Sequence, residues 1–363
     1  MLKLSNMGPN EFRNYSKDKK IYIYGAGRAL ESCLDLYFND KQISGVVDSN
    51  ENKKGQTVKY GEYLTYIINK NELVHRIAAD DKKKNILIMI SSPIYAADIV
   101  EELDELPELD GIECFLQILV RNTKEDYPDF EFTKSEQKIP KKIHYIWVGG
   151  KPLPYEFEKN IESWKKYNSD YEIIRWDETN YDMSVNKYTM QAYESGAWGF
   201  VVNYMRLDIL YKYGGIYLDT DVEAISNFDK LLNDDMFMCM GCGDRVNNGC
   251  GFGTIAGHKL INSIMNEFEN AEFVENGIPL KKPCHTFLHP ALRDYGFNIE
   301  NKYQKINGAV LYPAEVMSPL RIAGIEDWIT DKTVSLHKES ATWKNDKEKA
   351  AGEKIAGLIK RIL

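Results

Sequence analysis

The stretch VVNYMRLDILYKYGGIYLDTDVE holds the side chains of this chain that are best suited to chemistry. Tyr217, Asp219 and Asp221 follow each other at strand spacing, so their side chains can point the same way. Two carboxylates at one sheet edge suit a hard divalent cation, which prefers oxygen ligands and can hold a diphosphate. Asn203 and Arg206 are three residues apart and therefore share a helix face. The pattern predicts a cation and diphosphate site beside an arginine.

Three elements must position these side chains. We expect a helix over Phe200–Tyr213, a stop at Gly214-Gly215 and a strand over Ile216–Leu218. The glycine pair would turn the polar face of the helix toward the acids. A lone Asp-x-Asp is often only a surface turn. The helix, the glycine pair and the strand in this order weaken that explanation.

The N-terminal part of the chain has another glycine turn. Strand Ile21–Tyr24 leads into Gly25-Ala26-Gly27, a helix over Arg28–Asn39 follows, and strand Ile43–Val47 ends at Asp48. Strands alternating with helices, including later strands at Ile86–Ile90 and Gly111–Val120, predict a doubly wound parallel sheet. Gly25, Gly27 and Asp48 form a partial dinucleotide fingerprint, but Leu30 replaces its third glycine. A structural turn without a ligand is favoured over a second nucleotide site.

Length and composition predict the organisation. A chain of 363 residues exceeds one ordinary core, so two α/β domains are expected. We predict a Rossmann-like domain over residues 1–120, a polar linker over 121–140 and a second domain over 141–363. The tail has Ile355, Leu358, Ile359 and Ile362 at helical spacing among lysines. Such a basic helix would either lie on the inner membrane surface or dock on the protein itself.

Charge and hydropathy exclude several classes of protein. A formal charge of −9 disfavours a general nucleic-acid binder. The longest apolar runs are too short to cross a bilayer, and the first residues lack the apolar core of a secretory signal. Six scattered cysteines favour reduced thiols over a disulfide framework. We therefore expect a cytoplasmic protein.

Four segments together resemble a known family: IPKKIHYIWVGGKPLP, EIIRWDE, VNYMRLDILYKYGGIYLDTDVE and LHKESATW. Across about residues 138 to 345 the chain resembles the Asp-x-Asp glycosyltransferases of family 32, which are related to the catalytic domains of clostridial glucosylating toxins. The resemblance implies a GT-A fold, a nucleotide-sugar donor, Mn²⁺ or Mg²⁺, and retention of anomeric configuration. It also implies a glycan or lipid-linked acceptor, because the bacterial relatives mostly build capsular or lipopolysaccharide glycans.

The same resemblance implies roles for individual residues. Arg206, Asp219 and Asp221 would be the catalytic group, with Asp221 binding the metal directly and Asp219 reaching the metal shell, the ribose and the sugar. The residues that would contact the nucleotide sugar are Ile146, Trp147 as the base-stacking ring, Asn203, Tyr217, Ser340 and Trp343. His337 would complete the metal site.

Asn203 departs from the family, which usually has Asp at this position. An amide keeps one acceptor, gains a donor and loses the charge. This change brings the inherited sugar preference into question, and it favours a competing interpretation, a catalytically dead protein that only binds a sugar nucleotide.

Three further functions would depend on different residues. An NAD-dependent sugar-modifying oxidoreductase would use the turn at Gly25 and Gly27. An aspartyl-phosphate hydrolase is disfavoured, because Glu223 stands where Thr or Val is expected. A zinc site at Cys239-x-x-Cys242 lacks a second close pair, so buried thiols are favoured.

Overall fold

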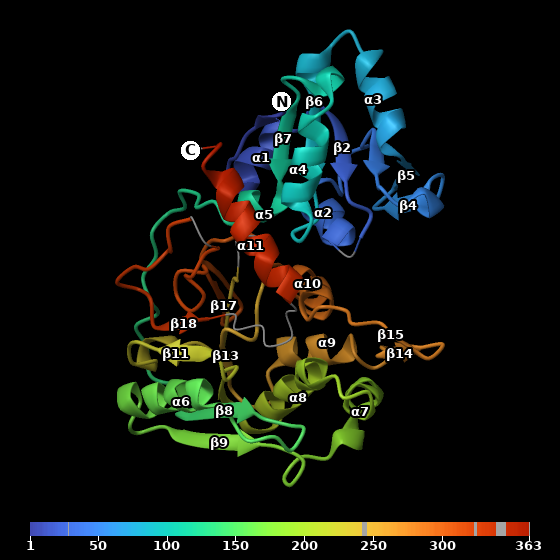
Figure 1. Ribbon diagram of the computed structural model, residues 1–363. Helices are drawn as coiled ribbons and strands as arrows, with labels where there is room; N and C mark the ends of the chain where they lie inside the picture. Colours follow the sequence, from blue (N-terminus) through green and yellow to red (C-terminus); the bar gives the residue numbers. More distant parts are fainter. Residues whose placement is uncertain (28, 242–244, 323–324, 339–345, 363) are drawn as a thin grey trace. The chain divides into compact units, whose positions relative to one another are not determined.

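The computed structural model describes residues 1–363 except 28, 242–244, 323–324, 339–345 and 363. The chain forms two compact units (Figure 1). Unit 1 comprises Met1–Asp126, Arg321–Glu326 and Lys344–Leu363, and unit 2 comprises Tyr127–Leu320 and Asp327–Trp343. Within the described part of the chain, every helix is too short or too polar to cross a membrane.

Unit 1 is built on a seven-stranded sheet in the order β1-β7-β6-β2-β3-β5-β4. All neighbouring strands are parallel except the hairpin of β4 and β5. The strands are β1 (Lys3–Leu4), β2 (Lys20–Tyr24), β3 (Gly45–Val47), β4 (Thr57–Tyr60), β5 (Tyr63–Ile68), β6 (Ile86–Ile90) and β7 (Glu113–Leu116). The helices are α1 (Pro9–Tyr15), α2 (Ala29–Tyr37), α3 (Lys70–Ala78), α4 (Ala96–Asp104), α5 (Gln117–Val120) and α11 (Asp346–Ile359).

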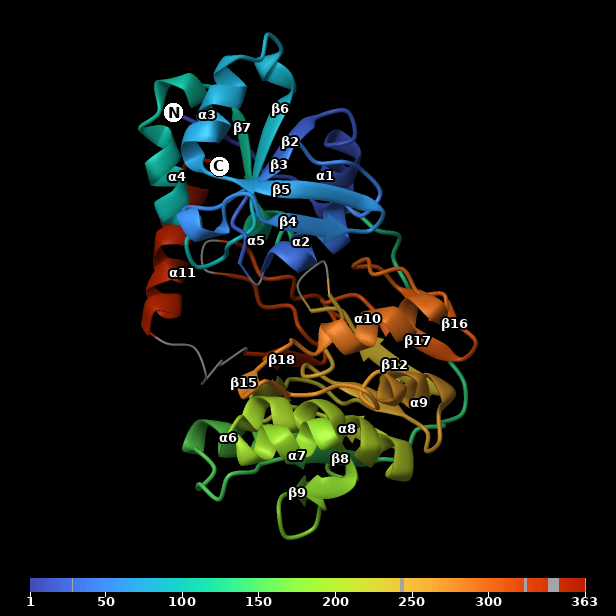
Figure 2. The same cartoon turned by 90° about the vertical axis from the view of Figure 1, so that its right-hand side faces the viewer.

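Helices cover both faces of this sheet (Figure 2). Successive strand residues point to opposite faces, so one strand can serve two cores. On one face, Tyr24 and Ile88 pack with the apolar residues of α3, α4 and α11. On the other, Phe115 packs edge-on against Phe12 of α1, which also contacts Tyr37 of α2. The expected α/β class with parallel strands is therefore confirmed.

The C-terminal helix belongs to unit 1. Ile355, Leu358 and Ile359 are buried in the same core as α4, and Lys354 pairs with Asp98. The predicted second domain, residues 141–363, therefore differs from unit 2 at its C-terminal end. Because the apolar side of α11 is covered by protein, it is not free to lie on lipid. Of the two expectations for the tail, docking on the protein itself is the one observed.

Two further segments of the chain differ from expectation. The predicted strand Gly111–Val120 is strand only over β7, after which α5 is helical. The predicted linker also contributes to a core, since Phe130 and Ile139 are buried in unit 2. Phe130 stacks on Tyr303 with ring centroids 5.1 Å apart. A few apolar anchors are enough to fix a segment whose overall composition is polar.

Unit 2 contains a mixed seven-stranded sheet in the order β16-β17-β12-β13-β10-β8-β9. Its strands are β8 (Lys142–Ile146), β9 (Glu172–Trp176), β10 (Gly215–Tyr217), β12 (Met236–Cys239), β13 (Phe252–Thr254), β16 (Gln304–Ile306) and β17 (Ala309–Tyr312). Two short pairs lie outside it, β11 (Val222–Ala224) with β18 (Ser335–His337), and β14 (Val274–Glu275) with β15 (Ile278–Pro279). The helices are α6 (Tyr155–Tyr167), α7 (Lys187–Glu194), α8 (Trp198–Tyr213), α9 (Lys259–Asn266) and α10 (His285–Asp294).

The predicted order of helix, glycine pair and strand is confirmed in unit 2. Helix α8 ends at Gly214, and both Gly214 and Gly215 have positive φ angles, of 62° and 102°. A Cβ on Gly215 would lie 2.9 Å from the backbone oxygen of Lys142 on the neighbouring strand β8. Both the conformation and the close approach therefore require glycine. The chain reverses here, so α8 leads directly back into β10.

A buried histidine reinforces this junction. Trp176 donates its indole N–H to His144 Nδ1 over 3.0 Å, so Nε2 carries the proton and donates to the Gly214 carbonyl over 2.9 Å. Burial lowers the pKa of His144 to about 4, although the Gly214 bond opposes the shift. The imidazole is therefore neutral at physiological pH.

We expect this histidine to make the fold acid-sensitive. Its unfolded pKa lies near 6.5, so stability is complete above that pH and falls as the pH drops toward 4, by about 3 kcal/mol in total. Urea unfolding of the wild type and of His144→Asn across pH 7 to 4 measures the effect. The variant should start less stable but lose less on acidification. Parallel pH profiles would contradict the prediction.

Candidate functional site

The two acids of the Asp-x-Asp motif lie just beyond the C-terminal end of β10. Asp219 is fixed by its own backbone, because its N–H donates to the Gly249 carbonyl over 3.1 Å and its carbonyl accepts the Val222 N–H at 3.1 Å. The Asp221 carbonyl accepts the Lys338 N–H, also at 3.1 Å. A local turn and two segments distant in the sequence, at Gly249 and Lys338, thus position the motif.

A histidine completes a cluster with these acids. Strand β11 pairs antiparallel with β18 so that Val222 lies opposite His337. His337 Nε2 then lies 3.3 Å from Asp221 Oδ1, and one donor atom from each of Asp219, Asp221 and His337 lies within 4.8 Å of the others. Two carboxylates and an imidazole suit a divalent ion such as Mn²⁺. Among the described residues, Asp219, Asp221 and His337 form the group of acidic, histidine and cysteine side chains that lie close enough together to hold a metal ion.

Asp219 lies between the cluster and two further side chains. Its Oδ1 accepts the Tyr217 hydroxyl at 2.7 Å and lies 3.5 Å from Arg206 Nη1. Burial raises the pKa of the Asp219 carboxyl, the Arg206 charge opposes this shift, and Asp221 adds to it. Burial and the Asp219 carboxylate raise the pKa of Tyr217 well above its usual value. Tyr217 therefore stays protonated and can keep donating to Asp219.

Arg206 is held in one orientation by its neighbours on α8 and beyond. The side chain is only 4% exposed. Its Nε donates to the Val202 carbonyl over 2.9 Å, Nη1 to Asn248 Oδ1 over 3.3 Å, and Nη2 to Asn203 Oδ1 over 3.5 Å. Burial lowers the pKa of Arg206, but Asp219, with smaller contributions from Tyr217, Cys284 and Asp221, raises it, and the net shift is upward. The guanidinium is a fixed, buried positive charge facing the Asp-x-Asp motif.

Asn203 is joined to the same network. Its Nδ2 donates to the Tyr188 hydroxyl over 3.4 Å, while its Oδ1 faces Arg206. The expectation that Asn203 and Arg206 share a face is confirmed by this contact. Because Asn203 carries no charge, the carboxylate that lies against Arg206 is that of Asp219.

Sequence reasoning missed the segment Asn247-Asn248-Gly249. Asn247 Nδ2 contacts His337 Nδ1 at 3.3 Å, and Asn248 accepts from Arg206. A Cβ on Gly249 would overlap Asp219 Oδ2, so the absence of a side chain at this position leaves room for the carboxylate. The side chain of Asn248 is buried, and its Nδ2 has no hydrogen-bond partner among the described residues. In the sequence, Asn-Asn-Gly indicates only a turn, because its contacts are made with residues far along the chain.

Trp147 stands at the end of β8, on the same sheet edge as Asp219. Its N–H donates to the Trp176 carbonyl over 2.9 Å, and its indole donates to the Lys151 carbonyl over 2.7 Å. Phe157 packs edge-on against the ring at 5.7 Å. The ring is half-buried, whereas the side chain of Ile146 is buried. Trp147 is thus fixed and retains exposed surface.

Some of the other predicted residues fall outside the part of the chain that the structure describes. Ser340 and Trp343 lie outside the described residues, as does Cys242. Cys239 and Cys250 are fully buried thiols, consistent with the structural explanation of the Cys239-x-x-Cys242 motif.

Neighbouring residues of the N-terminal turn provide the hydrogen-bond and ion-pair partners of Asp48. Asp48 Oδ2 accepts the Ala26 N–H at 2.8 Å and pairs with Lys53 Nζ at 2.9 Å. Lys53 also donates to the Ala26 carbonyl over 3.0 Å. In a dinucleotide site this acid would hold a ribose hydroxyl. Gly25, with φ of 113°, and Gly27 thus form a turn that its own acid and lysine stabilise.

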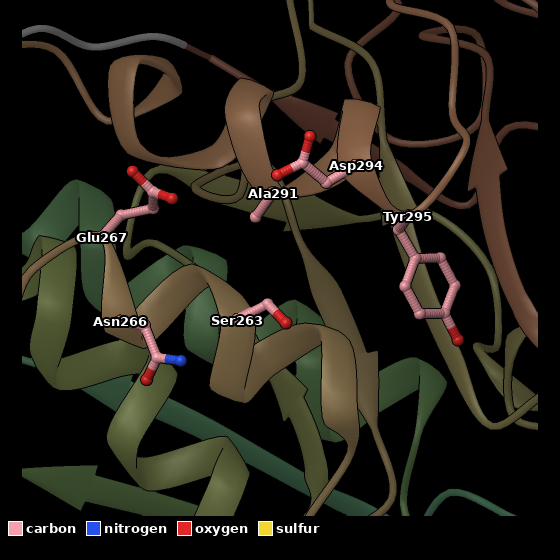
Figure 3. A pocket seen from close by; sticks show the side chains of 6 residues that line it. All are labelled: Ser263, Asn266, Glu267, Ala291, Asp294 and Tyr295. Atoms are coloured by element: carbon pink, nitrogen blue, oxygen red, sulfur yellow. The ribbon is translucent and has the colours of Figure 1, made fainter.

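A concavity of about 290 Å³ lies between α9 and α10 (Figure 3). It is lined by Ser263, Asn266, Glu267, Ala291, Asp294 and Tyr295. None of these residues belongs to the Asp219 cluster, so this concavity is separate from the site described above.

Comparison with known proteins defines the class. Residues 154–238 match the model of the glycosyltransferase sugar-binding region containing a DXD motif. This segment includes Asn203, Arg206, Asp219 and Asp221, whereas Trp147, Asn248 and His337 lie outside it. The chain therefore contains a glycosyltransferase region, and the DXD motif of that region is the acid pair at the end of β10.

Two curated proteins are similar to part of this chain. Inositol phosphoceramide mannosyltransferase 3 of Schizosaccharomyces pombe is 32% identical over 106 residues, 28% of this chain and 30% of that protein. Subversion of eukaryotic traffic protein A of Legionella pneumophila is 31% identical over 120 residues, 26% of this chain and 18% of that protein. The matches thus span less than a third of each relative. A solved structure, PaToxG glycosyltransferase, is 18% identical over 43% of this chain and 68% of its own, with a TM-score of 0.35, too low to carry an argument.

Proposed function

We propose that this protein is a metal-dependent, retaining glycosyltransferase that uses a UDP-linked sugar. The observation that carries the proposal is the cluster of Asp219, Asp221 and His337 beside the buried guanidinium of Arg206. Unit 1 would be a Rossmann-like domain and unit 2 a GT-A domain. The acceptor would be a glycan or lipid-linked saccharide in capsular or lipopolysaccharide synthesis, met at the inner face of the membrane, as the family resemblance implies.

The donor set fits Mn²⁺ or Mg²⁺, and Asp219, Asp221 and His337 would hold it. The ion would bind the diphosphate and stabilise the charge that develops on the leaving group. Arg206 would add a fixed positive charge that needs no reorganisation during the reaction. Tyr217 would hold the Asp219 carboxylate in place through its hydroxyl. Asn203 and Asn248 flank the guanidinium and would contact the donor sugar.

Retention would follow from attack on the face from which the diphosphate departs. The bond from the anomeric carbon to the phosphate oxygen breaks, and the acceptor oxygen forms its bond on that same face. The proton of the acceptor hydroxyl passes to the departing phosphate oxygen. In this scheme the residues of the chain position and stabilise, and none forms a covalent intermediate.

A thermal-shift panel of nucleotide sugars, with and without MnCl₂, tests the donor class. Stabilisation by UDP-sugars only when the metal is present is expected, since a ligand that binds the folded state raises its melting temperature. Asp221→Asn should abolish this shift, whereas Asp48→Asn, the matched change in unit 1, should leave it intact. Stabilisation by NAD that is lost in Asp48→Asn would replace the proposal with an oxidoreductase.

One observation favours a second candidate, a protein that binds a sugar nucleotide without turning it over. Asn203 supplies an amide where the family has a carboxylate, and it faces Arg206. Release of UDP from the stabilising donor, with and without acceptor glycans, separates the two candidates. Metal-dependent release supports the enzyme. Tight binding without release, together with release by Asn203→Asp, supports the binding protein.

A further inference from the structure

Trp198, the first residue of α8, is a large aromatic side chain that the core does not absorb. It is 37% exposed. Its indole lies directly against Gly149, where a Cβ would come within 2.7 Å of Trp198 Cε2. Tyr193 packs against it edge-on, with ring centroids 5.3 Å apart. These contacts fix the ring from behind and leave part of its surface open.

The turn beneath this ring is itself held in place. Gly149 has a φ of 92°, and its N–H donates to Glu178 Oε1 over 2.5 Å. Trp147, which is also half-exposed, comes only two residues earlier. One glycine turn thus follows Trp147 directly in the sequence and carries the indole of Trp198 against Gly149, which has no side chain to obstruct it.

The helix direction relates this turn to the Asp219 cluster. Because the chain reverses at Gly214, α8 runs back along β10, and its first residues lie toward the C-terminal ends of β8 and β10. Arg206 is eight residues after Trp198, a distance of about 12 Å along a helix that rises 1.5 Å per residue. A ligand whose diphosphate is held near Arg206 could therefore extend along α8 toward Trp198 and Trp147.

We propose that Trp198 is the second aromatic wall of a nucleobase subsite, with the donor base held between Trp147 and Trp198. The inference rests on the proposed function and adds to it a second residue that would hold the base. Every base has an aromatic face that can stack on an indole, and a ring already fixed by its neighbours loses little freedom on binding. Trp147 and Trp198 would thus act together in binding the base, while Arg206 and the metal ligands act on the diphosphate.

The experiment separates binding of the base from binding of the diphosphate. Dissociation constants for UDP, GDP and inorganic pyrophosphate are measured by calorimetry with MnCl₂, using the full chain. Trp198→Ala should weaken the preferred nucleoside diphosphate roughly 5- to 100-fold, the effect of losing one base stack, and leave pyrophosphate unchanged. Trp198→Phe should restore part of the affinity. Tyr66→Ala, which removes another exposed aromatic ring, on β5 of unit 1, is the matched control and should change neither constant.

A double-mutant cycle tests whether the two walls share one ligand. Trp147→Ala and Trp198→Ala should be non-additive, because the second loss acts on a base that has already lost one wall. Equal weakening of nucleotide and pyrophosphate would show that Trp198 only supports the turn. An unchanged nucleotide constant with a raised acceptor KM would assign Trp198 to the acceptor, and would also overturn the inference. If the wild type binds pyrophosphate with Mn²⁺ but neither UDP nor GDP, this inference fails while the metal site stands. If the wild type binds none of the three ligands, the proposed function fails as well.

Discussion

Asp221→Asn should lower glycosyl transfer by roughly 100- to 1,000-fold while the protein stays folded. Asp221 Oδ1 lies 3.3 Å from His337 Nε2, and its backbone carbonyl accepts a hydrogen bond from the Lys338 N–H. The substitution therefore changes the proposed metal-binding side chain without disturbing the backbone of the strand pair. The amide keeps the shape of the side chain but loses the charge that would hold the cation. Initial rates of UDP release across a MnCl₂ titration measure the loss, and the apparent metal affinity should fall with them.

Glu223→Gln is the matched control for this change. Glu223 lies two residues further along, where it pairs with Lys338 at 2.9 Å on a partly exposed surface. An exposed pair of this kind contributes little, so rate and metal dependence should be near those of the wild type. Wild-type rates for Asp221→Asn in excess EDTA would remove Asp221 from the metal site.

Gly249→Ala should lower turnover about 100-fold, because it displaces the Asp219 carboxylate. The added methyl group would overlap Asp219 Oδ2. Asp219 cannot simply turn away, because Tyr217 and Arg206 hold its other oxygen. The expected result is a displaced carboxylate, a lower rate and a weaker response to Mn²⁺, measured by the same release assay.

The control for Gly249→Ala is Gly357→Ala in α11. A Cβ at Gly357 meets nothing within 4 Å, so this substitution should leave turnover unchanged and stabilise the helix slightly. If Gly249→Ala retains both the rate and the metal dependence of the wild type, then the position of Asp219 is not as tightly fixed as its contacts indicate.

The sequence predicted best what is local. The stop at Gly214-Gly215 and the common face of Asn203 and Arg206 follow from helix geometry and from glycine conformations, and both were found. The parallel strands of unit 1 likewise follow from short apolar runs separated by a glycine turn and a helix. Each of these features is decided by residues that are close together in the sequence.

What the sequence could not predict depends on long-range contacts. His337 reaches Asp221 only because β18 pairs with β11, and the resemblance, rather than any spacing, indicated it. Asn248 and Gly249 matter because of what they touch, not because of a local pattern. Trp198 lies before the predicted helix Phe200–Tyr213, and only its long-range contact with Gly149 distinguishes it from other exposed aromatic residues.

The burial of α11 in unit 1 has a practical consequence for dissecting this protein. Unit 1 is formed by both ends of the chain, so unit 2 is an insertion within it, and the two units do not simply follow one another in the sequence. An expression fragment covering 141–363 would present Ile355, Leu358 and Ile359 to solvent without their partners, which favours aggregation. It would also discard Phe130 and Ile139 from the core of unit 2. Excision at residues 127 and 343 keeps these apolar residues with their own cores, but it also removes the segment Arg321–Glu326 from unit 1.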